Sequence, residues 1–249
     1  MQASAILTIA WRELLLYARN KGRVIGTLGA PFFYLVFLGF GLNSIVNVKG
    51  TSYFSFLVPG IIGMVILFQS VFSALSVITE RQFGFLKEML VAPISRTDIV
   101  LGKAIGNSLT AAIQAILVLA IGFLIGFQFT QPWWNIPIAV LVMLLSGIGF
   151  VALGLALASR LSDPGAFPTI VNFLVFPLFL LSGTIFPMET APAWLQSIAM
   201  LDPLTYAVDM LRGLLLGTNN LPMWISISAI IIFDSAIILL AAFLFRKTE

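Results

Sequence analysis

The sequence predicts an all-helical integral membrane protein that crosses the bilayer six times. Of its 249 residues, 60% are apolar and only 9% are charged, and the mean hydropathy is +1.08. A soluble domain of this length would carry roughly 25% charged residues. The apolar residues gather in runs long enough for helices to cross about 30 Å of hydrocarbon. A membrane β-barrel would instead show short segments of alternating hydropathy.

The apolar runs and the segments between them predict one transmembrane domain over residues 1–249. An amphipathic interfacial helix is expected over residues 1–24, because several apolar residues there share one helical face. That face consists of Ile6, Ile9, Ala10, Leu14 and Tyr17. The six spans are expected at about residues 25–46, 55–79, 99–127, 136–158, 165–187 and 223–245. Residues 80–98 and 188–222 are the two longest connections, and residues 246–249 complete the chain.

The distribution of Lys and Arg predicts that both termini lie in the cytoplasm. With this orientation, eleven of the 13 basic residues fall in inner segments, and only Lys49 and Arg212 fall in outer ones. Basic residues near span ends are enriched on the cytoplasmic side of membranes. Aromatic residues that favour the membrane interface agree with this topology, since they fall at predicted outer edges. They are Trp133, Trp134, Trp194 and Trp224.

The chain contains neither cysteine nor histidine. This excludes a disulfide framework, a thiolate nucleophile, a Cys/His zinc site and an imidazole base. A Gly-x-x-x-x-Gly-Lys-Ser/Thr phosphate loop is also missing, because Gly102-Lys103 has no glycine five residues before it and is followed by Ala104. We therefore predict no catalytic residue, no metal site and no cofactor site in this chain.

The connection between the second and third spans is both charged and apolar. The stretch "ERQFGFLKEMLVAPISR" carries five charges in 17 residues. One face of the predicted helix is nevertheless apolar and consists of Phe83, Leu86, Met89 and Leu90. Pro93 ends this helix, and Ser95 with Asp98 predicts a capping box for the next span. Two interpretations remain open, a helix lying on the inner leaflet and a helix that docks a cytoplasmic partner.

The outer connection between the fifth and sixth spans is long and apolar, and two short helices are predicted in it. The first is expected to be capped by Thr190, with Pro192 in its first turn. The second is bounded by Asp202 as N-cap, Pro203 at the first helical position and Gly217 just past the end. Both helices are too short to span the membrane. They are expected to form either a surface hairpin or a lid over the exit of a pathway.

Polar residues follow one face of the second predicted span. Gln69, Ser73, Ser76 and Glu80 recur at helical spacing and lead toward the cytoplasmic connection. In the fifth span, a similar face carries Asn172, Phe176 and Phe179. Together these residues predict a pathway lining for an amphiphilic substrate. Ordinary helix packing is the alternative, because small and hydroxyl residues also hold membrane helices together.

One acidic residue, Asp234, lies near the middle of the last span. A charge at this depth costs about 2.5–3.5 kcal/mol on insertion scales. Asp234 is therefore expected either to take part in transport or to pair within its own bundle, with Gln114 or with a backbone group.

The order and spacing of these segments resemble the type-2 permeases of ABC transporters, the integral membrane subunits of bacterial and archaeal exporters. The likeness is carried by "ERQFGFLKEMLVAPISRTDIVLGK" at 80–103, by "FPLFLLSGTIFPMETAPAWLQSIAMLDPLTYAVDMLRGLLLG" at 176–217, and by the six-span layout. The Pro-Leu-Thr-Tyr segment looks most similar to drug- and lipid-exporting members. Gln82 departs from the family, which often has an acidic residue at this position.

The resemblance implies that the connection after the second span is a coupling helix that inserts into a separate nucleotide-binding subunit. The implied contact residues are Glu80, Arg81, Phe83, Gly84, Leu86, Lys87, Met89, Leu90, Pro93 and Arg96. Residues 160–164 would form a second, smaller contact. ATP and Mg²⁺ would be bound by that partner subunit, and a second copy of the chain or a homologous permease would complete the pathway. The implied location is the plasma membrane of a bacterium or archaeon.

The function implied is ATP-driven export of an amphiphilic substrate that is drug-like, lipid or lipid-linked. A permease for polysaccharides or glycolipids is the related alternative. An ion-coupled secondary transporter is the alternative of a different class, because Pro59, Gly60 and Gly63 interrupt the second span while Pro168 and Pro177 interrupt the fifth, as in carriers built from repeats. The substrate itself is not specified by any motif.

Overall fold

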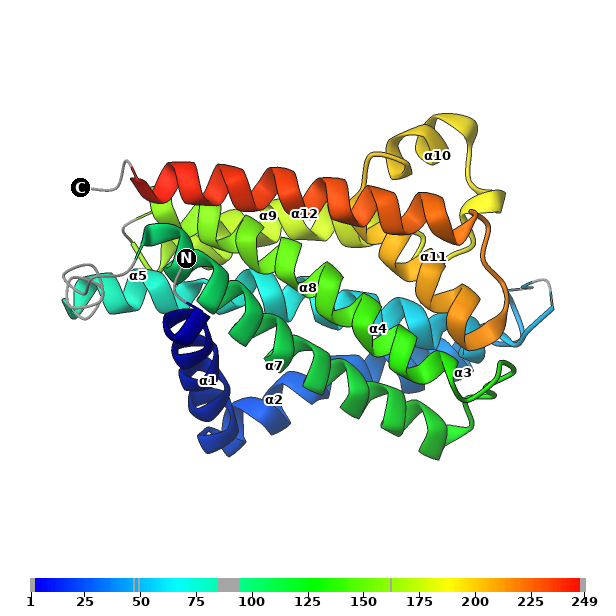
Figure 1. The fold of residues 1–249 in the computed structure, drawn as a ribbon. Coiled ribbons are helices and arrows are strands. Elements are labelled where there is room, and N and C mark those ends of the chain that lie inside the picture. The colour runs from blue at the N-terminus through cyan, green and yellow to red at the C-terminus, as the bar shows by residue number, and fades with distance from the viewer. Residues whose placement is uncertain (1–2, 47, 49, 85–94, 162, 247–249) are drawn as a thin grey trace.

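The computed structural model describes residues 3–46, 48, 50–84, 95–161 and 163–246 of the chain. The long helices lie side by side along one axis, and the first helix crosses them at the end where α5 and the C-terminus lie (Figure 1). The short helices α10 and α11 occupy the opposite end. The helices along this axis include α2 (Lys21–Phe33), α4 (Tyr53–Ser73), α7 (Arg96–Ile125), α8 (Asn135–Arg160), α9 (Ala166–Leu181) and α12 (Met223–Arg246). The other elements are α1 (Ala3–Arg19), η1 (Tyr34–Leu38), α3 (Gly39–Gly41), α5 (Leu75–Gln82), η2 (Met188–Thr190), α10 (Ala193–Ala199) and α11 (Pro203–Leu216).

Five helices within the described residues are long and apolar enough to cross a membrane. They cover Val24–Gly41, Tyr53–Gln82, Thr97–Ile125, Asn135–Arg160 and Met223–Leu244. The chain is therefore a multi-pass helical protein, as predicted. The expected fifth span is shorter than predicted, because α9 has only 16 residues. At 1.5 Å per residue this helix is roughly 24 Å long, and the six-span count stays a prediction.

The end of α9 has a local cause. Gly183 adopts a φ of 71°, which turns the chain out of the helix just after Leu181. A side chain at this position would be strained in that conformation. The uncharged residues that follow, up to 187, therefore form a non-helical segment instead of the last turns of the predicted span.

The capping predictions are confirmed for two helices and wrong for one. At the start of α7, the Asp98 N–H donates to Ser95 Oγ at 3.1 Å and the Ser95 N–H donates to Asp98 Oδ2 at 3.3 Å. At the start of α11, the Leu204 N–H donates to Asp202 Oδ1 at 2.9 Å. In contrast, α10 begins at Ala193 without a side-chain cap, because Thr190 belongs to the separate turn η2.

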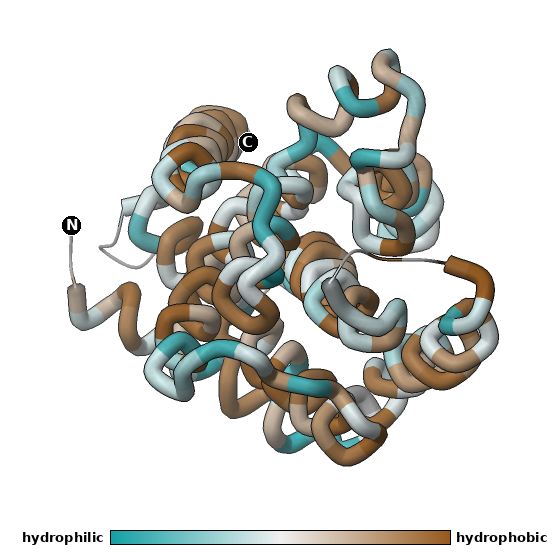
Figure 2. The backbone as a smooth tube through the Cα atoms, turned by 90° about the vertical axis from the view of Figure 1, so that its right-hand side faces the viewer, coloured by the Kyte–Doolittle hydropathy of each residue, from teal (hydrophilic) through white to brown (hydrophobic). Residues whose placement is uncertain are grey.

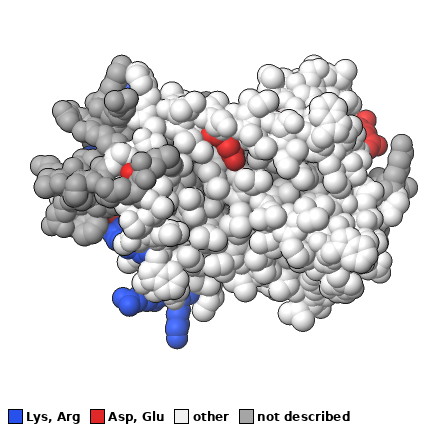
Figure 3. Space-filling view, viewed as in Figure 1, with Lys and Arg blue, Asp and Glu red and all other residues white. Residues whose placement is uncertain are grey.

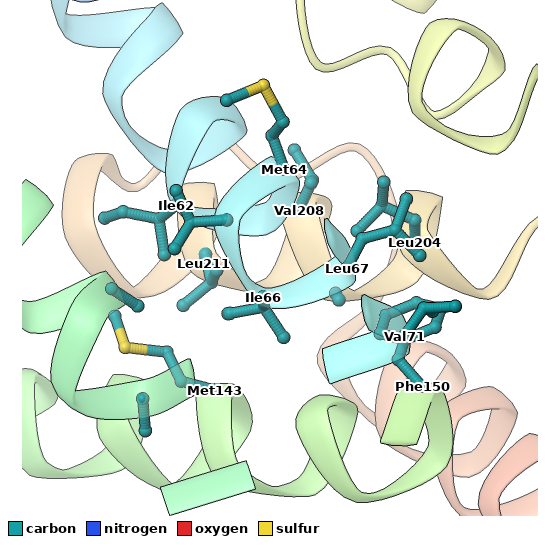
Figure 4. Packing of buried hydrophobic residues seen from close by; sticks show 14 of the residues in the cluster. Ile62, Met64, Ile66, Leu67, Val71, Met143, Phe150, Leu204, Val208 and Leu211 are labelled. Carbon is teal, nitrogen blue, oxygen red and sulfur yellow. The ribbon is translucent and has the colours of Figure 1, made fainter. Parts of the chain in front are cut away.

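The core forms around α4, which contacts α7, α8, α9 and α11. Ile62, Ile66 and Leu67 of α4 are fully buried, and Val208 and Leu211 of α11 pack beside them (Figure 4). This packing brings a helix from the far end of the sequence against the second span. It also fixes α4 as the central helix along which the cavities described below are arranged.

The outside of the bundle is apolar as well. Viewed from the α11 end, the helices carry hydrophobic residues on all sides of the bundle (Figure 2). The side chains of Phe173 and Leu124, for example, are 85% and 88% exposed. Few charged side chains interrupt the long flank, and basic ones gather at the α1 end (Figure 3). Such a surface is stable in hydrocarbon but not in water, which agrees with insertion in a bilayer.

Candidate translocation cavities and cytoplasmic contact

A central cavity of about 360 Å³ lies between α2, α4 and α9. Five of its 13 lining residues are aromatic. The Phe68 ring contacts the rings of Phe176 and Phe179 edge-on, with centroids 5.7 and 6.0 Å apart. Tyr34 contributes from the π-helical turn η1, a distortion that often accompanies functional sites. The lining residues are Gly26, Thr27, Ala30, Pro31, Tyr34, Met64, Val65, Phe68, Gln69, Phe72, Gln114, Phe176 and Phe179.

A second, basal cavity of about 600 Å³ lies toward the α5 end of the bundle. Its lining residues are Arg12, Leu16, Thr27, Gln69, Phe72, Ser73, Leu75, Ser76, Thr79, Glu80 and Phe83. The two cavities share Thr27, Gln69 and Phe72 as lining residues. They therefore adjoin, and together they give a candidate route from the α1–α5 end into the middle of the bundle.

The structure gathers most of the residues predicted to line a pathway. Gln69, Ser73, Ser76 and Glu80 line the basal cavity, and Phe176 and Phe179 line the central one. Asn172 lines neither cavity and lies on the exposed side of α9. Its separation has a simple reason, because the basal cavity takes its wall from α1, α2, α4 and α5 and receives nothing from α9.

Four charged side chains form a compact cluster beside the basal cavity. Lys103 Nζ of α7 lies 2.9 Å from Glu13 Oε1 of α1 and 2.8 Å from Glu80 Oε2 of α5. Arg12 Nη1 lies 2.8 Å from Glu80 Oε1 and 3.4 Å from Glu13 Oε1. Among the described residues, two cations therefore balance two anions, and this pairing allows the 1% exposed Lys103 to stay charged in the interior.

The same cluster fastens α1 to α7. Gly102 and Gly106 face α1, and a Cβ added to either would come within 2.8 Å of Ile9 or Ala10. Small residues at this spacing let two helix backbones approach closely. The predicted apolar face of α1 is thus buried against α7, while Leu7 and Trp11 are exposed on the other side. The ion pair between Glu13 and Lys103 was not predicted from the sequence. A signal was present, because a lysine within an apolar run indicates a buried acidic partner.

The segment predicted to contact an ATPase subunit is described only at its beginning. Phe83 follows the last turn of α5 and is 83% exposed, and Gly84 takes a φ of 78°. Arg81 donates to the carbonyls of Ala158 and Leu161 at 3.4 and 3.3 Å, so it joins the end of α5 to the end of α8. The other predicted contact residues lie outside the described residues or have no described side chain. They are Leu86, Lys87, Met89, Leu90, Pro93 and Arg96.

A third cavity, of about 330 Å³, lies among η2, α10 and α11 at the opposite end. A buried loop, residues 182–185, separates this outer cavity from the central one, because Phe179 lines the central cavity and Ser182 lines the outer cavity. Arg212 Nη2 donates to the carbonyls of Gly183 and Thr184 at 2.8 and 3.2 Å. These bonds satisfy carbonyls that a non-helical buried segment would otherwise leave unpaired.

Burial sets the electrostatics of this outer region. It lowers the pKa of Arg212 to about 9, an effect that the nearby Asp209 partly offsets. It raises the pKa of Asp202 to about 7, because the carboxylate loses water and gains only the Leu204 N–H in return. Arg212 therefore stays charged at neutral pH, whereas Asp202 titrates close to neutrality.

The raised pKa of Asp202 predicts a pH-dependent stability. Between pH 3.8, its ordinary value, and about 7, the folded chain holds a proton that the unfolded chain has lost. The contribution of Asp202 is therefore greatest below this window and falls as the pH rises through it. Asp202→Asn keeps the N-cap acceptor and should flatten the profile. Thermal midpoints of both proteins in detergent at pH 5 and pH 8 test this, and equal slopes would contradict it.

Asp234 is buried against Gly149 of α8 and lines a small hollow that includes Ser146 and Phe150. Gln114 instead lines the central cavity, so the predicted pairing of Asp234 with Gln114 is wrong. Neither the central nor the basal cavity includes Asp234 among its lining residues. It is therefore separated from the route that those cavities form.

The fold and cavities define a polytopic helical membrane protein with an internal route and a charged contact at one end. Residues 4–216 match the family model described as "ABC-2 type transporter". The chain therefore belongs to the ABC-2 type transporter family, whose members work as permease subunits with an ABC ATPase subunit.

Several curated proteins are similar to the chain. It is 30% identical over 196 residues to YbhR of Escherichia coli K12, named as a probable multidrug ABC transporter permease; this match covers 77% of the chain and 52% of YbhR. It is 34% identical over 208 residues to ycf38 of Porphyra purpurea, a transport permease by name, covering 81% and 70%. It is 25% identical over 242 residues to Nodulation protein J of Rhizobium leguminosarum bv. viciae, covering 96% and 90%. The chain thus spans about half the length of YbhR.

Proposed function

We propose that this chain is the membrane subunit of an ATP-driven exporter and moves an amphiphilic substrate out of the cytoplasm or the inner leaflet. The observation that carries this proposal is that the basal and central cavities adjoin and share three lining residues, Thr27, Gln69 and Phe72. Along this route the lining changes from charged and hydroxyl groups to aromatic rings. A molecule with one polar and one apolar end can be accommodated by such a gradient.

The energy would come from a separate nucleotide-binding subunit, which would bind ATP and Mg²⁺. The exposed Phe83 supports a docking contact at the end of α5, because an apolar ring in water gains from burial in a partner cleft. Arg81 and the charge cluster tie this end of α5 to α8, α7 and α1. A displacement of the docked segment would therefore reach the wall of the basal cavity directly.

A second copy of the chain would complete the pathway. Exposed aromatic side chains occur in the first span, at Phe33 and Phe37, and in α9, at Phe176, which lines the central cavity. A second copy placed against the first span and α9 would bury exposed rings and enclose the cavity. We propose this homodimer in a plasma membrane, with both termini in the cytoplasm.

Labelling of introduced cysteines tests the route, since the chain has no cysteine of its own. In inside-out membrane vesicles, Ser76→Cys should react with a water-soluble, membrane-impermeant maleimide, because Ser76 lines the basal cavity. Asn172→Cys is the matched control, since Asn172 lies outside both cavities on the exposed face of α9. Ser76→Cys that is as unreactive as Asn172→Cys would mean that water does not enter the proposed route.

A further inference from the structure

The central cavity contains two buried amide side chains whose hydrogen-bonding capacity is not used within the described residues. Gln69 and Gln114 are 8% and 2% exposed and come from α4 and α7. Gln69 Nε2 is a donor without a partner, and Gln114 Oε1 is an acceptor without a partner. A buried unsatisfied polar group costs about 1–3 kcal/mol. These two atoms are themselves enclosed, but both glutamine side chains line the same cavity, so their amides are the polar groups that a molecule bound there would meet.

The rest of the wall restricts the charge of that molecule. The lining combines rings, aliphatic side chains, Thr27 and the two glutamines, and none of its described residues is Asp, Glu, Lys or Arg. Moving a charged group into such a site without a counter-charge costs several kcal/mol. The charged residues of the route, Arg12 and Glu80, lie in the basal cavity and are paired with each other at 2.8 Å.

The size and chemistry of the cavity agree with a small ligand. Its volume of about 360 Å³ falls in the range of ligand pockets, which are typically apolar with a few polar groups that fix orientation. The rings of Phe68, Phe176 and Phe179 offer contact to an apolar body. Either orientation of a glutamine amide presents one donor and one acceptor, so the argument does not depend on how the amide is turned.

We propose that the central cavity selects uncharged amphiphiles that carry a hydrogen-bond donor next to an acceptor, such as an amide, with Gln69 and Gln114 as the specificity-determining residues. This inference rests on the proposed function and specifies its substrate class. The apolar part of the ligand lies among the rings of α4 and α9, and its amide group donates to one glutamine and accepts from the other. Organic cations and carboxylates of the same length are excluded from this cavity.

Photolabelling of the purified chain in nanodiscs tests the proposal without any ATPase subunit. The probe is an alkyl primary amide that carries a diazirine, and decanamide, decanoate and decyltrimethylammonium are the competitors. We expect mass spectrometry to locate the label in α2, α4 or α9, and decanamide to be the strongest competitor. The double variant Gln69→Met and Gln114→Met should bind the amide about tenfold more weakly, since two neutral hydrogen bonds of about 0.5–1.5 kcal/mol each are lost.

Gln128→Met is the matched control, because Gln128 is an exposed glutamine outside the central cavity. It should label as the unaltered chain does. Labelling confined to lipid-facing residues, equal competition by decanoate or decyltrimethylammonium, or an unchanged affinity of the double variant would each overturn the proposal. Amide-selective labelling together with an absence of ATP-dependent transport would refute the proposed function but leave the specificity of the cavity intact.

Discussion

Replacing Lys103 with methionine is expected to lower the free energy of unfolding by about 3–5 kcal/mol, because it removes one partner of a buried ion cluster. Lys103 Nζ bridges Glu13 and Glu80 at 2.9 and 2.8 Å and is 1% exposed. Without it, two buried carboxylates share the single cation Arg12. The thermal midpoint in detergent should fall by about 10 °C for a loss of this size in a chain of this length.

Two further variants separate charge from packing. Lys21→Met removes an exposed cation near the start of α2 and should leave the midpoint nearly unchanged. Lys103→Met combined with Glu13→Gln restores charge balance, since Arg12 and Glu80 remain paired, and should recover much of the lost stability. If the single and double variants were equally unstable, the loss would come from the shape of the side chain and not from its charge.

Phe83→Asp is expected to abolish assembly with the ATPase subunit while leaving the chain folded in the membrane. Phe83 is 83% exposed, so the substitution removes little from the isolated fold. In a docked complex it would instead bury an unpaired charge at a cost of several kcal/mol, which lowers affinity by more than about 100-fold. Copurification of the ATPase subunit with the tagged chain measures this effect.

Phe83→Leu is the matched control for this substitution, because it keeps an apolar side chain at the same position. It should retain the partner. A Phe83→Asp variant that still copurifies the ATPase subunit in normal amount would show that this residue lies outside the contact, and that Phe83 is exposed for another reason, such as contact with lipid.

The lengths of the apolar runs in the sequence were enough to predict the helical membrane fold, because a chain that crosses the bilayer must satisfy its backbone hydrogen bonds internally, as helices do. They failed at α9, because the span was predicted to continue to residue 187 and the helix ends at Leu181. The uncharged residues 182–187 are kept out of the helix by the left-handed turn at Gly183 and by the hydrogen bonds from Arg212 to the carbonyls of Gly183 and Thr184. Hydropathy does not detect a backbone turn that is stabilised by a distant side chain.

The candidate site was predictable where it followed a single helix. The periodicity of Gln69, Ser73 and Ser76 placed them on one face, and that face lines the basal cavity. Residues contributed by other helices were not predictable in this way. From α7, Gln114 lines the central cavity and Lys103 pairs with Glu80 of the basal cavity only because α7 packs against α4 and α1. A one-dimensional pattern contains no information on which helices become neighbours.

The central claim is that this permease acts only with a separate ATPase subunit, and ATP hydrolysis by the purified assembly tests it most directly. The tagged chain and its Phe83→Asp variant are purified from their native membranes in mild detergent, and vanadate-sensitive ATP hydrolysis is measured in both. The account predicts hydrolysis in the unaltered preparation and only background hydrolysis in the variant, because the chain itself has no phosphate loop. A folded, unaltered preparation without ATP hydrolysis, or equal hydrolysis in both, would contradict it.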